Sequence, residues 1–173
     1  MSSNTGRGWS AVLAVGLVMG GAGCSARSKL VVAEAPSVNL RTFSTLSVSV
    51  ESATAEPLDK ETAALAAETI SRVKNRGVFQ DVRLGSANES APGTLVLKAS
   101  VSRVKKVGRM KRALAGAFAG RASLTVQVRL VDAASGRELG TYTVVGQSGG
   151  LGVSGGTDDA VSKAAEQIAA IVS

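Results

Sequence analysis

The chain has 173 residues, of which 45% are hydrophobic and 3% aromatic, and its 20 lysines and arginines outnumber its 13 carboxylates to give a formal charge of +7. It contains one cysteine and no histidine, which excludes an intrachain disulfide and every catalytic or metal site that needs an imidazole. So few aromatic side chains argue against a stacking platform for nucleic acid, and we expect one domain with no cofactor, no metal and no nucleic-acid partner.

The first 23 residues have the pattern of a secretory signal peptide. A single cation, Arg7, precedes an apolar run that is short for a bilayer span and ends in small residues. The only cysteine, Cys24, follows directly, where a bacterial lipoprotein carries its acyl chains. Gly21 stands where lipoprotein signal peptidase prefers leucine, so an ordinary peptide cleaved near Ala22 and an uncleaved N-terminal anchor stay open. We predict a lipoprotein signal over residues 1–23 and lipidation of Cys24.

Residues 24–39 are predicted to be a flexible tether, because Ser25 to Ser37 is polar and rich in small residues. The folded part should then occupy residues 40–173 as a single domain. The lipid would attach it to a membrane of the cell envelope, and the absence of aspartate after Cys24 favours the periplasmic face of the outer membrane. The bilayer, bound through the N-terminal lipid, is therefore the first expected partner.

Hydrophobic periodicity predicts the elements of the first half of the domain. Residues 43–51 alternate between apolar and polar, as a half-buried strand does. Residues 56–76 follow a helical pattern with acidic residues in the first turn, and Gly77 is a suitable C-cap. Residues 78–84 form a short second strand, and residues 86–93 a loop.

The second half is predicted to be three strands and a helix. Residues 94–107 form a long strand whose alternation slips near residues 102–105, which indicates either a bulge or an exit of the strand from the sheet edge. A regular alternating row from Ala122 to Leu130 turns through residues 132–136 into a strand over 137–148, and Thr157 begins the last helix. The order β-α-β-β-β-β-α predicts an α+β fold, a largely antiparallel sheet of about five strands with two helices on one face.

Three segments resemble a family of small bacterial lipoproteins known as a domain of unknown function, DUF4410. They run from Thr94 to Val104, from Gly120 to Leu139, and through the glycine-rich stretch from Gly146 to Gly156. The resemblance covers roughly Leu40 to Ser173 and implies the fold. It supplies no catalytic residue. The arrangement also looks like the small α+β domains of periplasmic assembly lipoproteins, in topology alone.

The excess positive charge is concentrated between Glu89 and Asp132, where no acidic residue occurs. Residues 108–120 of this interval combine an apolar stripe at helical spacing with flanking cations. Such a stripe favours contact with anionic headgroups or with an acidic groove of an envelope protein. The alternative is a flexible connection whose glycines simply join two strands. The candidate contact residues are Arg109, Met110, Lys111, Arg112, Leu114 and Phe118.

No other motif indicates chemistry. Gly150 to Gly155 fits a dinucleotide-binding pattern, but only a helix follows, with no returning strand and no acidic residue for a ribose. The carboxylates stand where a turn or a helix N-terminus needs them. We therefore predict a noncatalytic, membrane-anchored lipoprotein that acts as an interaction or assembly module. An exported enzyme or small-ligand carrier is the alternative, and the sequence does not specify the oligomeric state.

Overall fold

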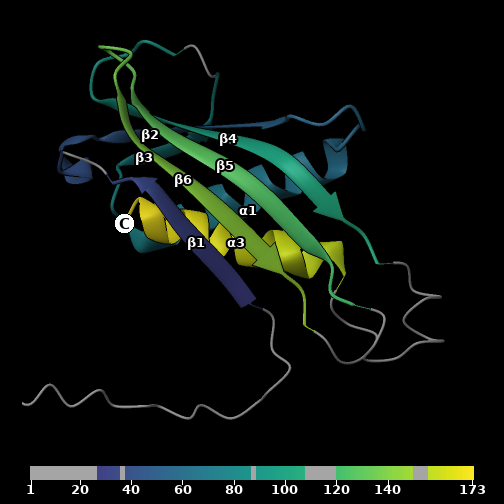
Figure 1. The fold of residues 1–173 in the computed structure, drawn as a ribbon. Helices are drawn as coiled ribbons and strands as arrows, with labels where there is room; N and C mark the ends of the chain where they lie inside the picture. Colours follow the sequence, from purple (N-terminus) through teal and green to yellow (C-terminus); the bar gives the residue numbers. More distant parts are fainter. Residues whose placement is uncertain (1–26, 36–37, 87–88, 108–119, 150–155) are drawn as a thin grey trace, which may run out of the picture.

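The computed structural model describes residues 27–35, 38–86, 89–107, 120–149 and 156–173. Within them the chain forms a mixed sheet and two α-helices (Figure 1). In chain order, the elements are β1 (Arg27–Glu34), the short 3-10 helix η1 (Leu40–Thr42), β2 (Thr45–Ser52), α1 (Asp59–Arg76), β3 (Asp81–Leu84), β4 (Thr94–Lys105), β5 (Ser123–Asp132), β6 (Glu138–Gln147) and α3 (Thr157–Ile171).

One sheet of six strands runs through the molecule in the order β1-β6-β5-β4-β2-β3. The pairs β1–β6, β5–β6 and β4–β5 are antiparallel, whereas β2 pairs in parallel with both β4 and β3. The predicted α+β class with two helices is therefore confirmed. The count of about five strands is wrong by one, and the sheet is antiparallel at one side and parallel at the other.

The additional strand is β1, which lies in the segment that we expected to be a flexible tether. It pairs with β6 from Arg27 onward, and Leu30 packs against the hydrophobic core. The Ser28 hydroxyl donates to Oε1 of Gln167 on α3, at 3.1 Å. Because polar residues flank this short apolar stretch on both sides, its sequence pattern does not predict a strand. The folded structure therefore includes residue 27, well before residue 40.

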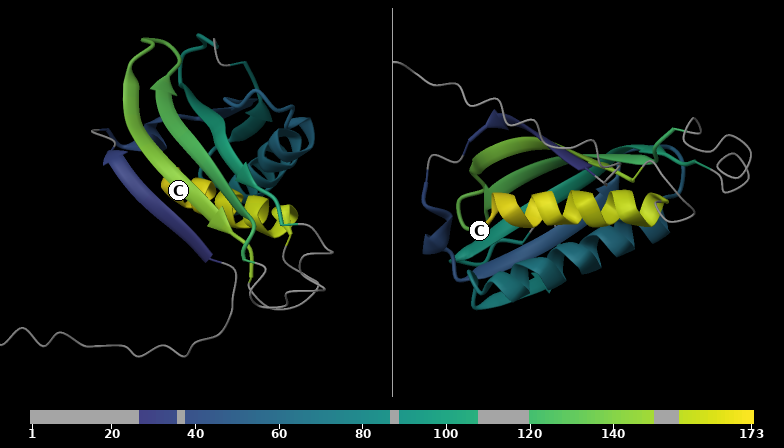
Figure 2. Two further views of the ribbon diagram at one scale, coloured as in Figure 1. Left: turned by 45° about the vertical axis from the view of Figure 1, so that its right-hand side comes forward. Right: turned by 90° about the horizontal axis from the view of Figure 1, so that it is seen from below.

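Both helices cover the same face of the sheet (Figure 2, right). The strands direct their apolar rows to that face, as the alternation predicts, and the rows are fully buried at Leu46, Leu97 and Val126. Helix α3 contributes Val161, Ala164 and Ile168 to the same core. The opposite face of the sheet carries no helix in the part of the chain that the structure describes, and we call it the outer face.

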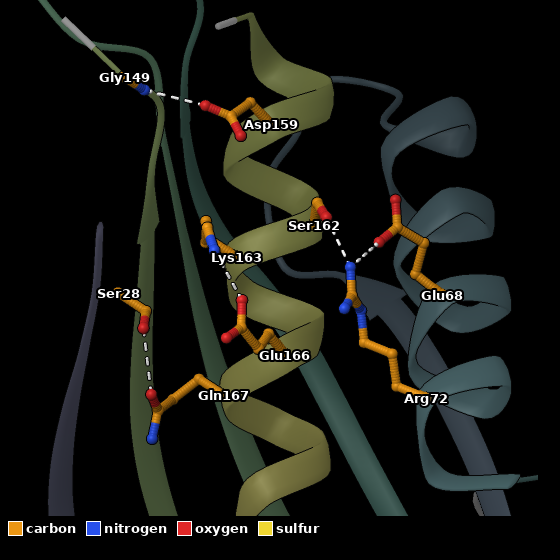
Figure 3. A network of polar contacts seen from close by, with 9 residues as sticks. All are labelled: Ser28, Glu68, Arg72, Gly149, Asp159, Ser162, Lys163, Glu166 and Gln167. Atoms are coloured by element: carbon orange, nitrogen blue, oxygen red, sulfur yellow. Dashed lines mark hydrogen bonds and ion pairs between the residues drawn. The ribbon is translucent and has the colours of Figure 1, made fainter. Parts of the chain in front are cut away.

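Arg72 joins the two helices. Its Nη2 donates to the Ser162 hydroxyl on α3 at 2.6 Å and to Oε2 of Glu68 on α1 at 2.9 Å (Figure 3). One turn later, Nη1 of Arg76 donates to the carbonyl of Ala169 at 3.1 Å. These contacts fix the spacing of the helices over the sheet. Neither described helix has the length and apolar character that a membrane crossing requires.

The predicted bulge in β4 is confirmed. Val101 pairs with Val126 and Arg103 with Thr125, so Ser102 is the extra residue. Its hydroxyl donates to the carbonyl of Thr125 at 3.3 Å. Because a bulge shifts the alternation by one residue, Arg103 and Lys105 project from the outer face.

Candidate functional site

The residues that the sequence singles out for function lie outside the described residues. These are Cys24, the contact residues Arg109, Met110, Lys111, Arg112, Leu114 and Phe118, and the glycines from 150 to 155. The structure describes the chain on both sides of residues 108–119 and 150–155, and the chain that follows Cys24 from Arg27 onward. The positions of these flanking residues show which end of the sheet each segment joins.

The N-terminal segment, which ends at residue 26, and residues 108–119, which we call the basic segment, join the same end of the sheet. The register aligns Arg27 at the start of β1 with Gln147 near the end of β6, Gln147 with Ser123 at the start of β5, and Ser123 with Lys105 at the end of β4. We call this the basal end. Residues 108–119 therefore connect two strands at the end of the sheet where β1 begins, which lies three positions after Cys24 in the sequence.

Five cations of the outer face, on β1, β4 and β5, make up what we call the cationic face. Lys29, Arg103, Lys105 and Arg129 are exposed, and Lys98 is half-buried. Within the described parts of the chain, none of the five has a carboxylate at ion-pair distance. They comprise Lys29, Lys98, Arg103, Lys105 and Arg129.

Two of these cations directly oppose each other. Lys98 on β4 pairs in register with Arg129 on β5, and like charges in this position weaken a sheet. Arg129 is not among the contact residues predicted from the sequence, because only the register of the strands brings it beside Lys98. The arrangement costs folding free energy, and an anionic partner would relieve the repulsion.

A further cation, Lys106, binds the helix layer instead. Its ammonium lies 2.7 Å from Oε1 of Glu61, a carboxylate in the first turn of α1 with a side chain only 11% exposed. The hydrogen bond from Lys106 lowers the pKa of Glu61 below its ordinary 4.5, against the opposing effect of burial. The same hydrogen bond raises the pKa of Lys106 above 10.5. This ion pair ties the end of β4 to α1.

We predict that Lys106→Gln lowers the free energy of unfolding at pH 7 by about 1 kcal/mol, because it leaves a nearly buried carboxylate without its charged partner. Since the pKa of Glu61 is lowered in the folded state, its contribution is present above pH 4.5 and is lost as the pH falls through the folded pKa. The difference between parent and variant should therefore shrink in acid. Urea unfolding at pH 7 and pH 3 measures it.

The matched control is Lys105→Gln, which removes an exposed cation with no ion pair in the described structure. It should leave the stability at pH 7 within about 0.5 kcal/mol of the parent. If the effect of Lys106→Gln were the same at both pH values, the ion pair with Glu61 would not be its cause.

Exposed apolar side chains mark both edges of the sheet. Val31 and Val32 on β1 are 47% and 51% exposed, and Leu84 on β3 is 67% exposed. No other large hydrophobic side chain among the described residues is exposed to this degree. Because β1 and β3 are the two outermost strands, these groups lie at opposite sides of the molecule.

An apolar groove adjoins Leu84, with a volume of about 480 Å³. It exists because β3 is short. Leu84 pairs with Val48, and residues 49–52 of β2 continue with no strand on that side in the described structure. The small side chains of α1 leave the space open. Its lining comprises Val50, Asp59, Thr62, Ala63, Ala66, Ala67, Ile70 and Leu84.

Other carboxylates serve local structure. Asp132 accepts from the Ser135 hydroxyl at 2.6 Å and from the backbone N–H of Ala134 at 3.1 Å, contacts that lower its pKa. Asp159 in the first turn of α3 accepts from the backbone N–H of Gly149 at 2.9 Å. The described residues hold no group of three or more acidic, histidine or cysteine side chains that could bind a metal ion.

Comparisons with known proteins give one family match and similar solved structures. The family model of the domain of unknown function DUF4410 matches residues 34–152. No curated protein matches the chain significantly in sequence. Among solved structures, the PelC dodecamer of Paraburkholderia phytofirmans is similar with a TM-score of 0.57 at 15% identity, over 84% of this chain and 97% of that chain. A single-substitution variant of that dodecamer gives a TM-score of 0.56 at the same identity and coverage.

The structural similarity at 15% identity establishes the fold alone. The family match, by contrast, is a match in sequence over residues 34–152. This range contains α1 and five of the six strands, β2 to β6. The chain therefore belongs to the DUF4410 family.

Proposed function

We propose that this chain is a noncatalytic lipoprotein of the cell envelope, attached to the periplasmic face of the outer membrane through acyl chains on Cys24, and that its domain assembles with further copies of itself. The attachment is supported by the signal-like N-terminus that ends at the only cysteine. A noncatalytic role is supported by a sequence without histidine. The observation that carries the assembly role is the exposed apolar residues on both edge strands, Val31, Val32 and Leu84.

Two different patches at opposite sides of one molecule suit a head-to-tail interface. Among the described residues, no strand pairs with the outer edge of β1 beside Val32 or with residues 49–52 of β2 beside the groove, so both edges offer backbone groups for pairing. A strand added along that edge would complete the sheet, and its apolar side chains would fill the groove. Repetition of such an interface generates a ring where the rotation closes, and a filament where it does not.

The similar PelC structure is a dodecamer, and this chain covers 97% of its length. That protein has a comparable fold and is a dodecamer, which has a fixed number of copies. This supports a closed ring rather than an open filament for the present chain. The basic segment with Arg109, Lys111 and Arg112 stays a proposed contact with headgroups or an envelope protein.

The assembly is tested by charge insertion at each patch. We expect the parent, purified as the full lipidated chain in mild detergent, to be oligomeric by native mass spectrometry. Val32→Asp and Leu84→Asp should each give monomers, because each buries a carboxylate in an apolar contact. Mixed together, the two variants should form a one-to-one dimer and stop, since one intact interface remains between them.

Ala134→Asp, in the exposed turn between β5 and β6, is the control and should keep the parent's oligomeric state. A parent that is monomeric at all concentrations would contradict the assembly role. Two variants that fail to combine when mixed would contradict the head-to-tail interface. The same spectra report the mass of the mature N-terminus, and an unmodified Cys24 would contradict the lipid attachment.

A further inference from the structure

We infer that the cationic face is the surface by which the domain rests on the anionic headgroups of the membrane that holds it, an inference whose orientation rests on the proposed attachment through Cys24. The inference starts from distance. Arg27 begins β1 three positions after Cys24, and three residues span at most about 11 Å even when fully extended. Acyl chains on Cys24 would therefore hold the basal end of the sheet at the headgroups.

The second step is the row of outer-face residues next to the basal end. The register aligns Lys29 with Val145, Val145 with Thr125, and Thr125 with Arg103, straight across four strands. Lys105 stands one row closer to the basal end, opposite Ser123. The row thus carries a cation at each side and only uncharged residues between them. This row can approach a plane of phosphates, because none of its four residues carries a negative charge.

The third step is the separation of charge between the two faces. Two carboxylates near the basal end belong to the helix layer and are paired there, Asp158 with Lys60 at 3.7 Å and Glu61 with Lys106 at 2.7 Å. On the outer face, Glu51 on β2 aligns with Ser100, one row from Arg103, and Glu138 lies at the far end of β6. Asp81 and Glu89 are paired with Arg83 at the β3 side of the sheet. Cations without a carboxylate partner thus predominate on the described part of the outer face near β1, β4 and β5. Anionic lipid therefore favours the orientation in which the outer face lies toward the bilayer and the helices away from it.

The fourth step is the electrostatic repulsion within the cationic face when no anionic partner is bound. Lys98 opposes Arg129 across β4 and β5 with no carboxylate at ion-pair distance in the described structure. A dense layer of headgroup phosphates would neutralise both side chains together. A lipid anchor combined with a basic surface gives far more durable attachment than one acyl chain alone, so the face would add to the anchor.

The test uses the full chain with Cys24→Ser, so that no acyl chain contributes to binding. The vesicles consist of phosphatidylcholine, either alone or with about 30 mol% phosphatidylglycerol, which makes their surface anionic. The quantity measured is the ratio of the partition coefficient in anionic vesicles to that in neutral vesicles. Binding through the apolar N-terminus contributes to both coefficients and therefore cancels in the ratio. The triple variant Lys29→Gln, Arg103→Gln, Lys105→Gln should lower this ratio on the order of a hundredfold.

The control triple variant, Arg41→Gln, Lys74→Gln, Arg137→Gln, removes the same charge from exposed positions away from the basal end and should keep the ratio within about threefold of the parent. Restoring Arg103 as lysine should recover part of the loss. Circular dichroism checks that each variant is folded. Equal ratios for the parent and the basal variant would overturn the inference, as would an equal loss in the control. Because Cys24 is absent from the assay, the result is independent of whether the native chain is lipidated.

Discussion

Gly146→Ala should destabilise the domain by about 3 kcal/mol, which lowers the Tm by roughly 10 °C. Gly146 lies on β6 opposite Leu124 and faces α3. A Cβ atom there would meet the carbonyl oxygen of Ala160 at 2.0 Å and the backbone nitrogen of Ala164 at 2.8 Å. Backbone atoms of a packed helix cannot rotate away as a side chain can, so α3 would have to move off the sheet.

The control is Gly156→Ser, because Gly156 is the N-cap of α3 with nothing within 4 Å of an added Cβ. Serine is a favourable N-cap residue, so this variant should be as stable as the parent or slightly more so. Urea unfolding followed by circular dichroism measures both. A loss below about 1 kcal/mol for Gly146→Ala would mean that α3 does not lie this close to β6.

Ile168→Ala should cost about 3 to 4 kcal/mol of the free energy of unfolding, because it removes three carbons from a fully buried site. With one cysteine in the sequence, no intrachain disulfide can compensate. Ile168 lies on the buried side of α3 within the core that the helices share with the sheet. A cavity at that point weakens the attachment of α3, and through it the contacts with Arg72 and Arg76 of α1.

Ile171→Ala makes the same chemical change one turn later, at a half-buried position of the same helix. It should cost only about 1 kcal/mol, since less of the side chain is removed from an enclosed space. Equal losses for the two variants would show that the stability does not follow the depth of burial along α3.

The elements with regular periodicity could be predicted from the sequence. The row from Leu124 to Leu130 is buried as its alternation indicates, and α3 begins at Thr157 as predicted. The bulge at Ser102 follows from a slip in the pattern of β4. Each of these features depends on residues close together in the chain, where the pattern is complete in itself.

Features that depend on pairing between distant segments could not be predicted. The strand β1 has few apolar residues, and its partner β6 lies more than a hundred positions later in the sequence. The parallel pairing of β2 with β4 leaves no local pattern. Likewise, the meeting of Lys98 with Arg129 requires the register, and the groove beside Leu84 requires that β3 end before β2 does.

The place of β1 in the sheet bears on how far the domain can search for partners. A linker of sixteen free residues would let the domain explore a radius of about 20 Å or more, whereas only Ser25 and Ala26 separate Cys24 from the first strand. In the proposed lipid-attached form, diffusion is confined almost to two dimensions, and neighbouring copies meet at a high effective concentration. Weak contacts between edge strands would then suffice for assembly at the membrane, even where the same contacts are too weak in dilute solution.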